Sequence, residues 1–156
     1  MQAAPSGASG WWAYETAVPA AETLYCPKAA RIIRRVKVAI VGSRHFPELE
    51  RVRDFVSSLP LGATVVTGGA SGVDAAAGEA ARSRQLGLIK LPPRFEESND
   101  PTASARRNQE LVDAAEVVVA FWDGESAGTR KTVERALESG REVHVLLPGS
   151  VGLKLG

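Results

Sequence analysis

The sequence predicts an α/β fold, a Rossmann-like doubly wound parallel sheet of about five strands with helices on both faces. Short apolar runs rich in β-branched residues alternate with amphipathic stretches of helical length throughout residues 36–148. Each apolar run is nearly continuous, which is typical of strands that are covered on both sides. Because crossovers between parallel strands are right-handed, this alternation predicts a doubly wound sheet.

The first half of the pattern contains three strands and two helices. The strands are expected at 36–41, 63–67 and 86–91, and glycine or proline follows each of them. A helix at 47–59 places its apolar residues on one face, and an alanine-rich helix is expected at 73–85.

The second half adds two strands and two helices after a loop. Residues 92–103 are rich in proline, asparagine, aspartate and serine and are predicted to form the loop. Helices are expected at 104–114 and 129–139, and strands at 117–122 and 143–147. The strand at 117–122 is the most apolar in the chain.

Composition excludes several classes of protein. The 156 residues are 44% hydrophobic and 24% charged, which suits one globular domain. No apolar run approaches the roughly 18 residues of a membrane span, and the opening residues lack the pattern of a signal peptide. One cysteine cannot form an internal disulfide, and no Cys/His cluster has metal-ligand spacing. We therefore expect a cytoplasmic protein with no membrane contact, no metal and no cofactor.

The charge is distributed unevenly along the chain. Residues 1–36 carry four basic and two acidic side chains, whereas residues 37–148 carry 14 basic and 16 acidic ones. A sequence-independent nucleic-acid binder needs a concentrated positive surface. The acidic balance of the main body therefore argues against nucleic acid as a partner.

Three parts are expected along the chain: an N-terminal arm at 1–35, a folded domain at 36–150 and a C-terminal tail at 151–156. The arm contains Trp11-Trp12-Ala13-Tyr14, whose aromatic area favours docking onto the body or onto a neighbouring subunit. A base-stacking platform and a disordered tail are the alternatives for this segment. Helix faces and the apolar arm together favour a homo-oligomer, a dimer or larger.

The candidate site lies where the strands end. Ligands of doubly wound sheets bind beyond the carboxyl ends of the strands. The candidate ligand-binding residues at these ends are Gly42, Ser43, Arg44, Gly68, Gly69, Ser71, Gly72, Asp74, Arg107, Asn108, Asp123, Ser126, Gly128 and Thr129.

The segment at 68–74 has three glycines between a strand and a helix. Glycine allows a bound group to approach the backbone, and the N–H groups at a helix start favour an anion such as phosphate. A tight turn that merely requires glycine is the alternative. The segment is neither a P-loop nor a dinucleotide fingerprint, which argues against ATP hydrolysis and NAD chemistry. Arg44 is placed to pair with phosphate or carboxylate, unless it forms a surface ion pair.

Three further candidates have a structural alternative. Thr129 opens a second turn of small residues and can cap its helix or donate to a ligand. Arg107 lies in the first turn of a helix, where positive charge opposes the dipole, so either an anionic partner or a solvated face explains it. Asp74 can cap its helix, hold a ribose hydroxyl or act as a base.

Four segments resemble the SLOG superfamily. They are Val-Ala-Ile-Val-Gly-Ser-Arg at 38–44, Gly-Gly-Ala-Ser-Gly-Val-Asp at 68–74, Arg-Asn at 107–108 and Phe-Trp-Asp-Gly-Glu-Ser-Ala-Gly-Thr at 121–129. That superfamily unites the DNA-processing protein DprA, the cytokinin-activating LOG enzymes and the YspA/YpsA-like proteins. The resemblance covers about residues 36–148 and is closest to the YspA-like branch. It implies a Rossmann-like domain that binds a nucleotide or a nucleotide derivative at these turns.

The resemblance and the residues together favour a cytoplasmic nucleotide sensor or carrier. Arg44 and Arg107 would neutralise phosphate, and Asp74 or Asn108 would hold ribose or base. The backbone cradle for the phosphate would consist of Gly68, Gly69, Gly72, Gly128 and Thr129. DprA-like members bind single-stranded DNA, and the acidic body argues against that activity here.

The alternative is an enzyme, a LOG-like nucleoside-monophosphate N-glycosidase (phosphoribohydrolase). LOG-type members use a glutamate three residues after the Gly–Thr pair, and Thr132 stands at that place in this sequence. Asp74, or Glu134 two residues beyond Thr132, would then serve as the catalytic carboxylate. The absence of the expected glutamate favours binding over hydrolysis.

Overall fold

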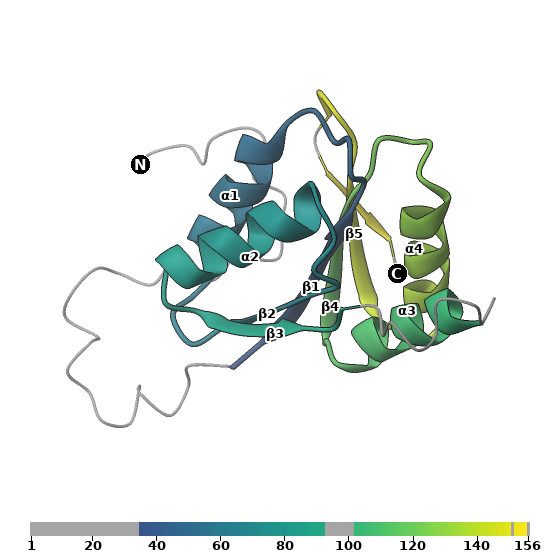
Figure 1. Ribbon diagram of the computed structural model, residues 1–156, viewed down its shortest axis with the longest axis horizontal. Helices are drawn as coiled ribbons and strands as arrows, with labels where there is room; N and C mark the ends of the chain where they lie inside the picture. The colour runs from purple at the N-terminus through teal and green to yellow at the C-terminus, as the bar shows by residue number, and fades with distance from the viewer. Residues whose placement is uncertain (1–34, 93–101, 151, 156) are drawn as a thin grey trace, which may run out of the picture.

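A six-stranded sheet lies between two pairs of helices (Figure 1). The computed structural model describes residues 35–92, 102–150 and 152–155. The strands are β1 (Lys37–Gly42), β2 (Thr64–Thr67), β3 (Gly87–Lys90), β4 (Val117–Phe121), β5 (Glu142–Leu146) and β6 (Leu153–Leu155). The helices are α1 (Leu49–Ser58), α2 (Val73–Ser83), α3 (Ala103–Asp113) and α4 (Ala127–Glu138).

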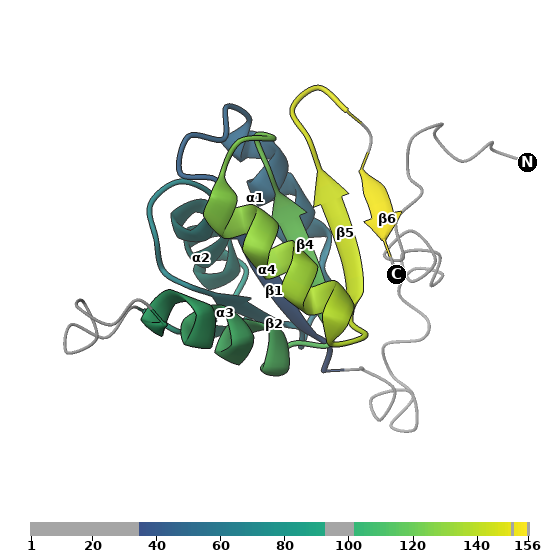
Figure 2. The same cartoon turned by 90° about the vertical axis from the view of Figure 1, so that its right-hand side faces the viewer.

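The strand order confirms the doubly wound fold. The sheet runs β3-β2-β1-β4-β5-β6, and its first five strands are parallel. Helices α1 and α2 cover one face, and α3 and α4 cover the other (Figure 2). This arrangement follows from the nearly continuous apolar runs, since a strand such as β4, buried at every position, requires cover on both sides.

Two apolar clusters form the core, one on each face of the sheet. Beneath α1 and α2, the side chains of Val52, Phe55 and Val56 pack with Phe121, whose ring meets that of Phe55 edge to face. Beneath α3 and α4, Leu111, Val112 and Ala136 pack on the opposite side of the strands. Side chains of successive residues in β1 and β4 contribute to the two clusters in alternation, as the pleat requires.

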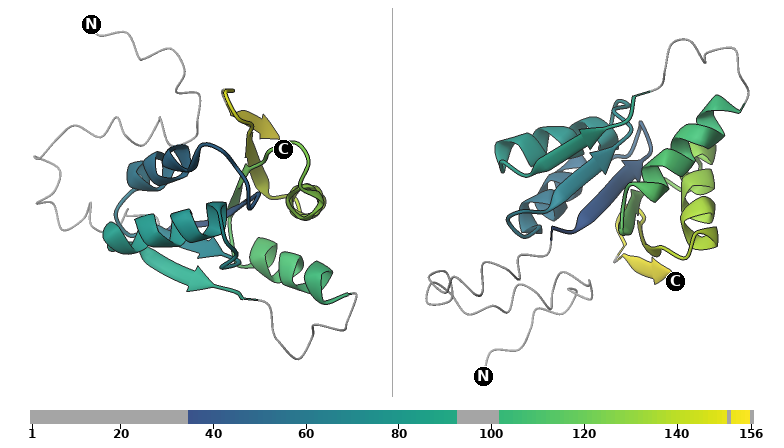
Figure 3. Two further views of the ribbon diagram at one scale, coloured as in Figure 1. Left: turned by 45° about the horizontal axis from the view of Figure 1, so that its top comes forward. Right: turned by 90° about the horizontal axis from the view of Figure 1, so that it is seen from below.

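The connections that leave β1 and β4 lead to opposite faces of the sheet, so the division of the doubly wound fold lies between these two neighbouring strands. From β1 the chain continues into α1 on one face, and from β4 it continues into α4 on the other (Figure 3). A crevice at such a division opens beyond the carboxyl ends of the two strands. Here the backbone N–H of Ser43 donates to the Phe121 carbonyl at 3.0 Å, so the pairing extends one residue past β1.

One strand was not predicted. The segment at 151–156 was expected to be a tail, but Leu153–Leu155 pairs antiparallel with β5 as β6. The run Leu-Lys-Leu is only three residues long, which is too short for the sequence pattern to indicate a strand, and all three residues are exposed. The reversal after β5, with Gly149 at φ +66°, brings it to the sheet edge.

Two predicted segments, the N-terminal arm and the loop at 92–103, lie largely outside the described residues. The arm at 1–35 lies outside the described residues except for Arg35, and so does most of the predicted loop at 92–103. Within the described part of the chain, no helix has the length and apolar character that a membrane crossing requires.

Candidate functional site

Three contacts bring the predicted site segments together at the carboxyl edge of the sheet. The backbone N–H of Asp123 donates to the Ser43 hydroxyl at 3.1 Å and joins the ends of β4 and β1. Arg107 of α3 donates to the carbonyl of Gly68 at 3.2 Å. The backbone of Arg44 lies against Gly72, the residue that precedes α2. The segments after β1, β2 and β4 and the first turns of α3 therefore form one continuous edge.

Gly72 sets how closely the first segment approaches α2. A Cβ atom at this position would collide with the Arg44 carbonyl and would lie 2.8 Å from both the carbonyl carbon and Cα of that residue. Its φ of +79° is also in the left-handed region that glycine adopts without strain. Gly72 therefore allows Arg44 to lie directly at the start of α2.

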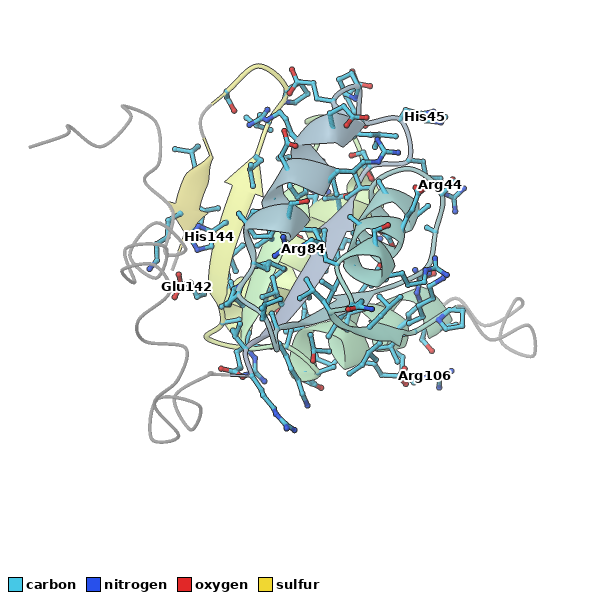
Figure 4. The ribbon with its side chains drawn as sticks, turned by 90° about the vertical axis from the view of Figure 1, so that its left-hand side faces the viewer. Arg44, His45, Arg84, Arg106, Glu142 and His144 are labelled. Atoms are coloured by element: carbon cyan, nitrogen blue, oxygen red, sulfur yellow. The ribbon has the colours of Figure 1, made fainter. Side chains whose placement is uncertain are left out.

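The Arg44 side chain is exposed and makes no hydrogen bond or ion pair with any described residue. Figure 4 shows it pointing outward, on the side of the molecule where Arg106 of α3 also projects. A guanidinium carries five N–H donors in a planar fork that matches phosphate and carboxylate. At this position those donors are available to a ligand.

The start of α2 carries no side-chain cap. Gly72 is the N-cap residue, and no side chain accepts a hydrogen bond from the first turn. Two N–H groups of the preceding turn are already used, because Gly69 donates to the Thr67 hydroxyl at 3.4 Å and Ala70 donates to Asp74 Oδ2 at 3.3 Å. The N–H groups of Gly69 and Ala70 are thus engaged, whereas the start of α2 has no side-chain acceptor.

Arg107 is engaged with the protein itself. Its Nε donates to the carbonyl of Leu91 at 3.2 Å, and its Nη2 donates to the carbonyl of Gly68 at the same distance. Nη2 also occupies the place where a Cβ atom of Gly68 would lie. The side chain therefore ties α3 to the carboxyl ends of β2 and β3.

Asp74 is turned inward. Its side chain is only 5% exposed, and its Oδ2 accepts the hydrogen bond from Ala70. Burial raises the pKa of Asp74, while the Ala70 hydrogen bond and the positive charge of Arg107 act in the opposite direction. The buried carboxylate therefore stabilises the turn at 68–72 through its hydrogen bond with the Ala70 N–H.

The second predicted turn, at 123–129, has its own caps. Asp123 Oδ1 accepts from the backbone N–H groups of Ser126 at 2.8 Å and Glu125 at 2.9 Å, and these bonds hold the pKa of Asp123 below its ordinary value. The Ser126 hydroxyl accepts from the buried Thr129 hydroxyl at 3.0 Å and from the Thr129 N–H at 3.4 Å. Asp123 therefore caps the N–H groups before α4 and Ser126 caps that of Thr129, whereas the start of α2 has no side-chain cap, so the two turns differ in what they offer an anion.

The remaining predicted residues are distributed along the same edge. Ser43 is 1% exposed, with its hydroxyl bound to the Asp123 N–H. Asn108 is half-buried on α3, and Gly128 and Ser71 are exposed. Gly42 is in close contact with Val73, which fixes the packing of β1 against the start of α2.

The two carboxylates of the enzyme hypothesis lie apart. Asp74 belongs to α2 on one face of the sheet, and Glu134 belongs to α4 on the other. The Glu134 side chain is 58% exposed and lies 3.6 Å from Arg130 on its own helix. Thr132, at the place of the expected glutamate, is buried and donates its hydroxyl to the Gly128 carbonyl.

Sequence reasoning missed two residues of this edge. The Thr67 hydroxyl accepts from Gly69 and donates to the Asp74 carbonyl at 3.4 Å, and the Leu91 carbonyl receives Arg107. A threonine directly before a glycine pair was a usable signal for Thr67. The Leu91 carbonyl is a backbone group, which no sequence pattern marks. The described residues contain no group of three or more His, Cys, Asp or Glu side chains placed to hold a metal ion.

The fold and the position of this edge define a Rossmann-like α/β domain whose polar and glycine-rich turns gather at the sheet division. The sequence profile of DNA recombination-mediator protein A matches residues 14–91, half of the chain. The chain belongs to this family. The finding confirms the DprA-related side of the predicted resemblance, while the YspA-like branch is not tested by it.

Solved structures show the same fold. DNA processing protein A (DprA) from Streptococcus pneumoniae matches with a TM-score of 0.63 and 24% identity, over 74% of this chain and 51% of that one. DNA processing protein A from Helicobacter pylori, described by its single-stranded DNA binding mode, matches with a TM-score of 0.55 and 23% identity, over 71% and 65%. The chain thus spans between half and two thirds of these relatives. No curated protein matches the chain significantly.

These findings correct one prediction. The argument against nucleic acid as a partner is wrong, since the family is one of DNA recombination mediators and the Helicobacter pylori protein binds single-stranded DNA. The argument used net charge, which averages over the whole surface, whereas binding depends on which charges stand at one place. Here Asp74 is buried and Asp123 caps its own turn, while Arg44 is exposed.

Proposed function

We propose that the carboxyl edge of the sheet binds the sugar-phosphate backbone of single-stranded DNA. Arg44 would pair with a phosphate group, and the first N–H groups of α2 would bind the same phosphate. Family membership supports the choice of nucleic acid. The binding is proposed for the domain at 36–150, which contains the carboxyl edge of the sheet.

One observation carries this proposal: an exposed arginine without a described partner lies against a helix start without a side-chain cap. The two donors come from different segments, and the contact of the Arg44 backbone with Gly72 brings these segments together. Helix N-termini favour anions through their dipole and their unpaired N–H groups. Together with the guanidinium they form a site for one phosphate.

A small nucleotide is the second candidate, because the same pair of donors accommodates a single phosphate. A nucleoside monophosphate offers that group without a polymer, as the resemblance to the YspA-like branch of the SLOG superfamily implies. The sensor or carrier hypothesis therefore uses the same residues with a smaller ligand. A cytoplasmic location belongs to both versions and is supported by the single cysteine.

The test is fluorescence anisotropy with a labelled oligothymidylate at several salt concentrations. Arg44→Gln should weaken binding about tenfold or more, since hydrogen bonds to charged groups contribute about 1.5–3 kcal/mol. Arg84→Gln is the matched control, because Arg84 is an exposed arginine at the end of α2, apart from Arg44 (Figure 4). Equal affinities of the two variants would contradict the role of Arg44.

Competition then distinguishes the two ligands. Unlabelled nucleoside monophosphates should displace the oligonucleotide only weakly if a polymer is the ligand. Displacement by one monophosphate at concentrations far below those of unlabelled oligothymidylate would favour the small-nucleotide version. Absence of binding to both would overturn the proposed site.

A further inference from the structure

Two backbone carbonyl groups at the carboxyl ends of β2 and β3 carry partial negative charge, which disfavours an anion at this edge. In parallel strands the carbonyl oxygens beyond the last pairing point outward, and partial negative charges there repel phosphate. The carbonyls concerned are those of Gly68 and Leu91, which follow β2 and β3 directly. Both accept a hydrogen bond from the Arg107 guanidinium at 3.2 Å.

We propose that Arg107 is a positioning residue that covers these two carbonyls and thereby holds the turn at 68–72 in its binding conformation, without contacting the ligand phosphate itself. The inference rests on the proposed function for the identity of the ligand. It differs from the sequence-based hypothesis, in which Arg107 neutralised the phosphate directly.

Geometry supports an indirect role. The side chain crosses from α3, on one face of the sheet, to the turn that leads into α2 on the other. Nη2 occupies the space beside the Gly68 Cα that a Cβ atom would need, and Asp74 Oδ2 lies 2.9 Å from that same point. Arginine and aspartate thus flank the glycine, which leaves no room there for a larger residue.

Charge supports the same role. Asp74 is nearly fully buried and lies in the field of Arg107, so the buried carboxylate already offsets part of the guanidinium charge. Asp74 also accepts the N–H of Ala70, inside the turn. Arg107 and Asp74 therefore hold the turn at two backbone groups, those of Gly68 and Ala70, and Arg107 also ties the turn to the Leu91 carbonyl after β3. Arg44 retains a guanidinium that no described residue engages.

Salt dependence separates direct contact from positioning. For single strands, log Kd changes with log salt by about 0.7 for each phosphate that the protein neutralises. Arg44→Gln should reduce this slope by about 0.7. Arg107→Gln should weaken oligothymidylate binding about tenfold at every salt concentration while its slope equals that of the wild type. A slope reduced as in Arg44→Gln would overturn the proposal.

Arg107→Lys provides a second variant that retains the charge. A lysine ammonium cannot reproduce the planar fork that reaches both carbonyls. We therefore expect weakened binding with an unchanged slope, and full affinity in this variant would contradict the proposal. If Arg107→Gln does not fold, hydrogen exchange of the segment at 68–74 in the lysine variant decides whether Arg107 holds the turn.

Hydrogen exchange without DNA tests the positioning step independently. Amides of the segment at 68–74 should exchange faster in Arg107→Gln and Arg107→Lys than in the wild type, and Arg84→Gln should leave them unchanged. Unaltered exchange in both Arg107 variants would overturn the positioning role. If the wild type binds no oligonucleotide, the proposed function fails, and the exchange experiment still decides whether Arg107 holds the turn.

Discussion

At the scale of single residues, the site depends on backbone positions that only glycine can occupy. Gly72 combines a positive φ with a close backbone contact, and Gly69, three residues earlier in the same turn, has a positive φ of +73° in open space. The pair therefore separates two physical effects, the strain of a left-handed backbone and a steric collision. Only the collision involves Arg44.

Gly72→Ala should lower the free energy of unfolding by about 1–3 kcal/mol more than Gly69→Ala, because overpacking adds to the backbone strain that both variants share. Denaturant unfolding of the two variants measures this difference. Gly72→Ala should also weaken oligothymidylate binding, since the Arg44 backbone must move. Equal stabilities would show that the contact at Gly72 relaxes without cost.

At the scale of the elements, an arginine joins α1 to the loop between β5 and β6. Arg51 donates to the carbonyls of Leu147 at 2.9 Å and Ser150 at 2.6 Å and pairs with Glu48 at 2.6 Å. Glu48 in turn accepts the N–H of Gly149, and its pKa is lowered chiefly by the hydrogen bond from Arg51. This contact fixes the reversal that leads into β6.

Arg51→Ala should cost about 1–2 kcal/mol of stability, because two carbonyls lose a charged donor. Arg53→Ala is the control on the same helix. Its partners Glu50 and Glu79 are exposed carboxylates, and exposed pairs contribute between zero and about 1 kcal/mol. Thermal unfolding compares the variants, and hydrogen exchange at 153–155 should rise only in Arg51→Ala. An equal loss in both would contradict the role of the loop contact.

At the scale of the whole molecule, buried and exposed carboxylates give opposite trends with pH. Burial tends to raise the pKa of Glu142, but hydrogen bonds from His144 and Lys154 lower it, and the pKa of Asp123 is also lowered. Groups with lowered pKa contribute stability above their unfolded pKa and lose it as the pH falls. Asp74, whose pKa is raised by burial, contributes stability at low pH and loses it as the pH rises.

The loss of stability caused by Asp74→Asn should therefore be largest at acidic pH and should shrink as the pH rises above the unfolded pKa of 3.8 through the raised folded value. Free energies of unfolding of both proteins across the acidic and neutral range measure this trend. Asp54→Asn is the control, since Asp54 is exposed on α1. A difference that grows with pH would contradict burial as the dominant cause.

Local pattern determined the succession of strands and helices. The apolar runs that became β1 to β5 are long enough to be recognised, and the near-continuous burial of β1 and β4 required helices on both faces. The same pattern placed Arg44, Gly68 and Gly72 at the carboxyl edge. The three exposed residues of β6 carry no such signal, because their pairing depends on where a distant loop directs them.

Tertiary structure alone decided what each polar group at the edge does. Sequence position put Arg44 and Arg107 at the same edge, but only the fold engages Arg107 with two carbonyls and leaves Arg44 exposed. The same holds for the carboxylates, since Asp74 is buried beneath its turn and Asp123 caps another. The physical reason is that the hydrogen-bond partners come from segments far apart in the chain. The local sequence therefore determines which element carries a side chain, and only the packing of the elements determines which groups that side chain contacts.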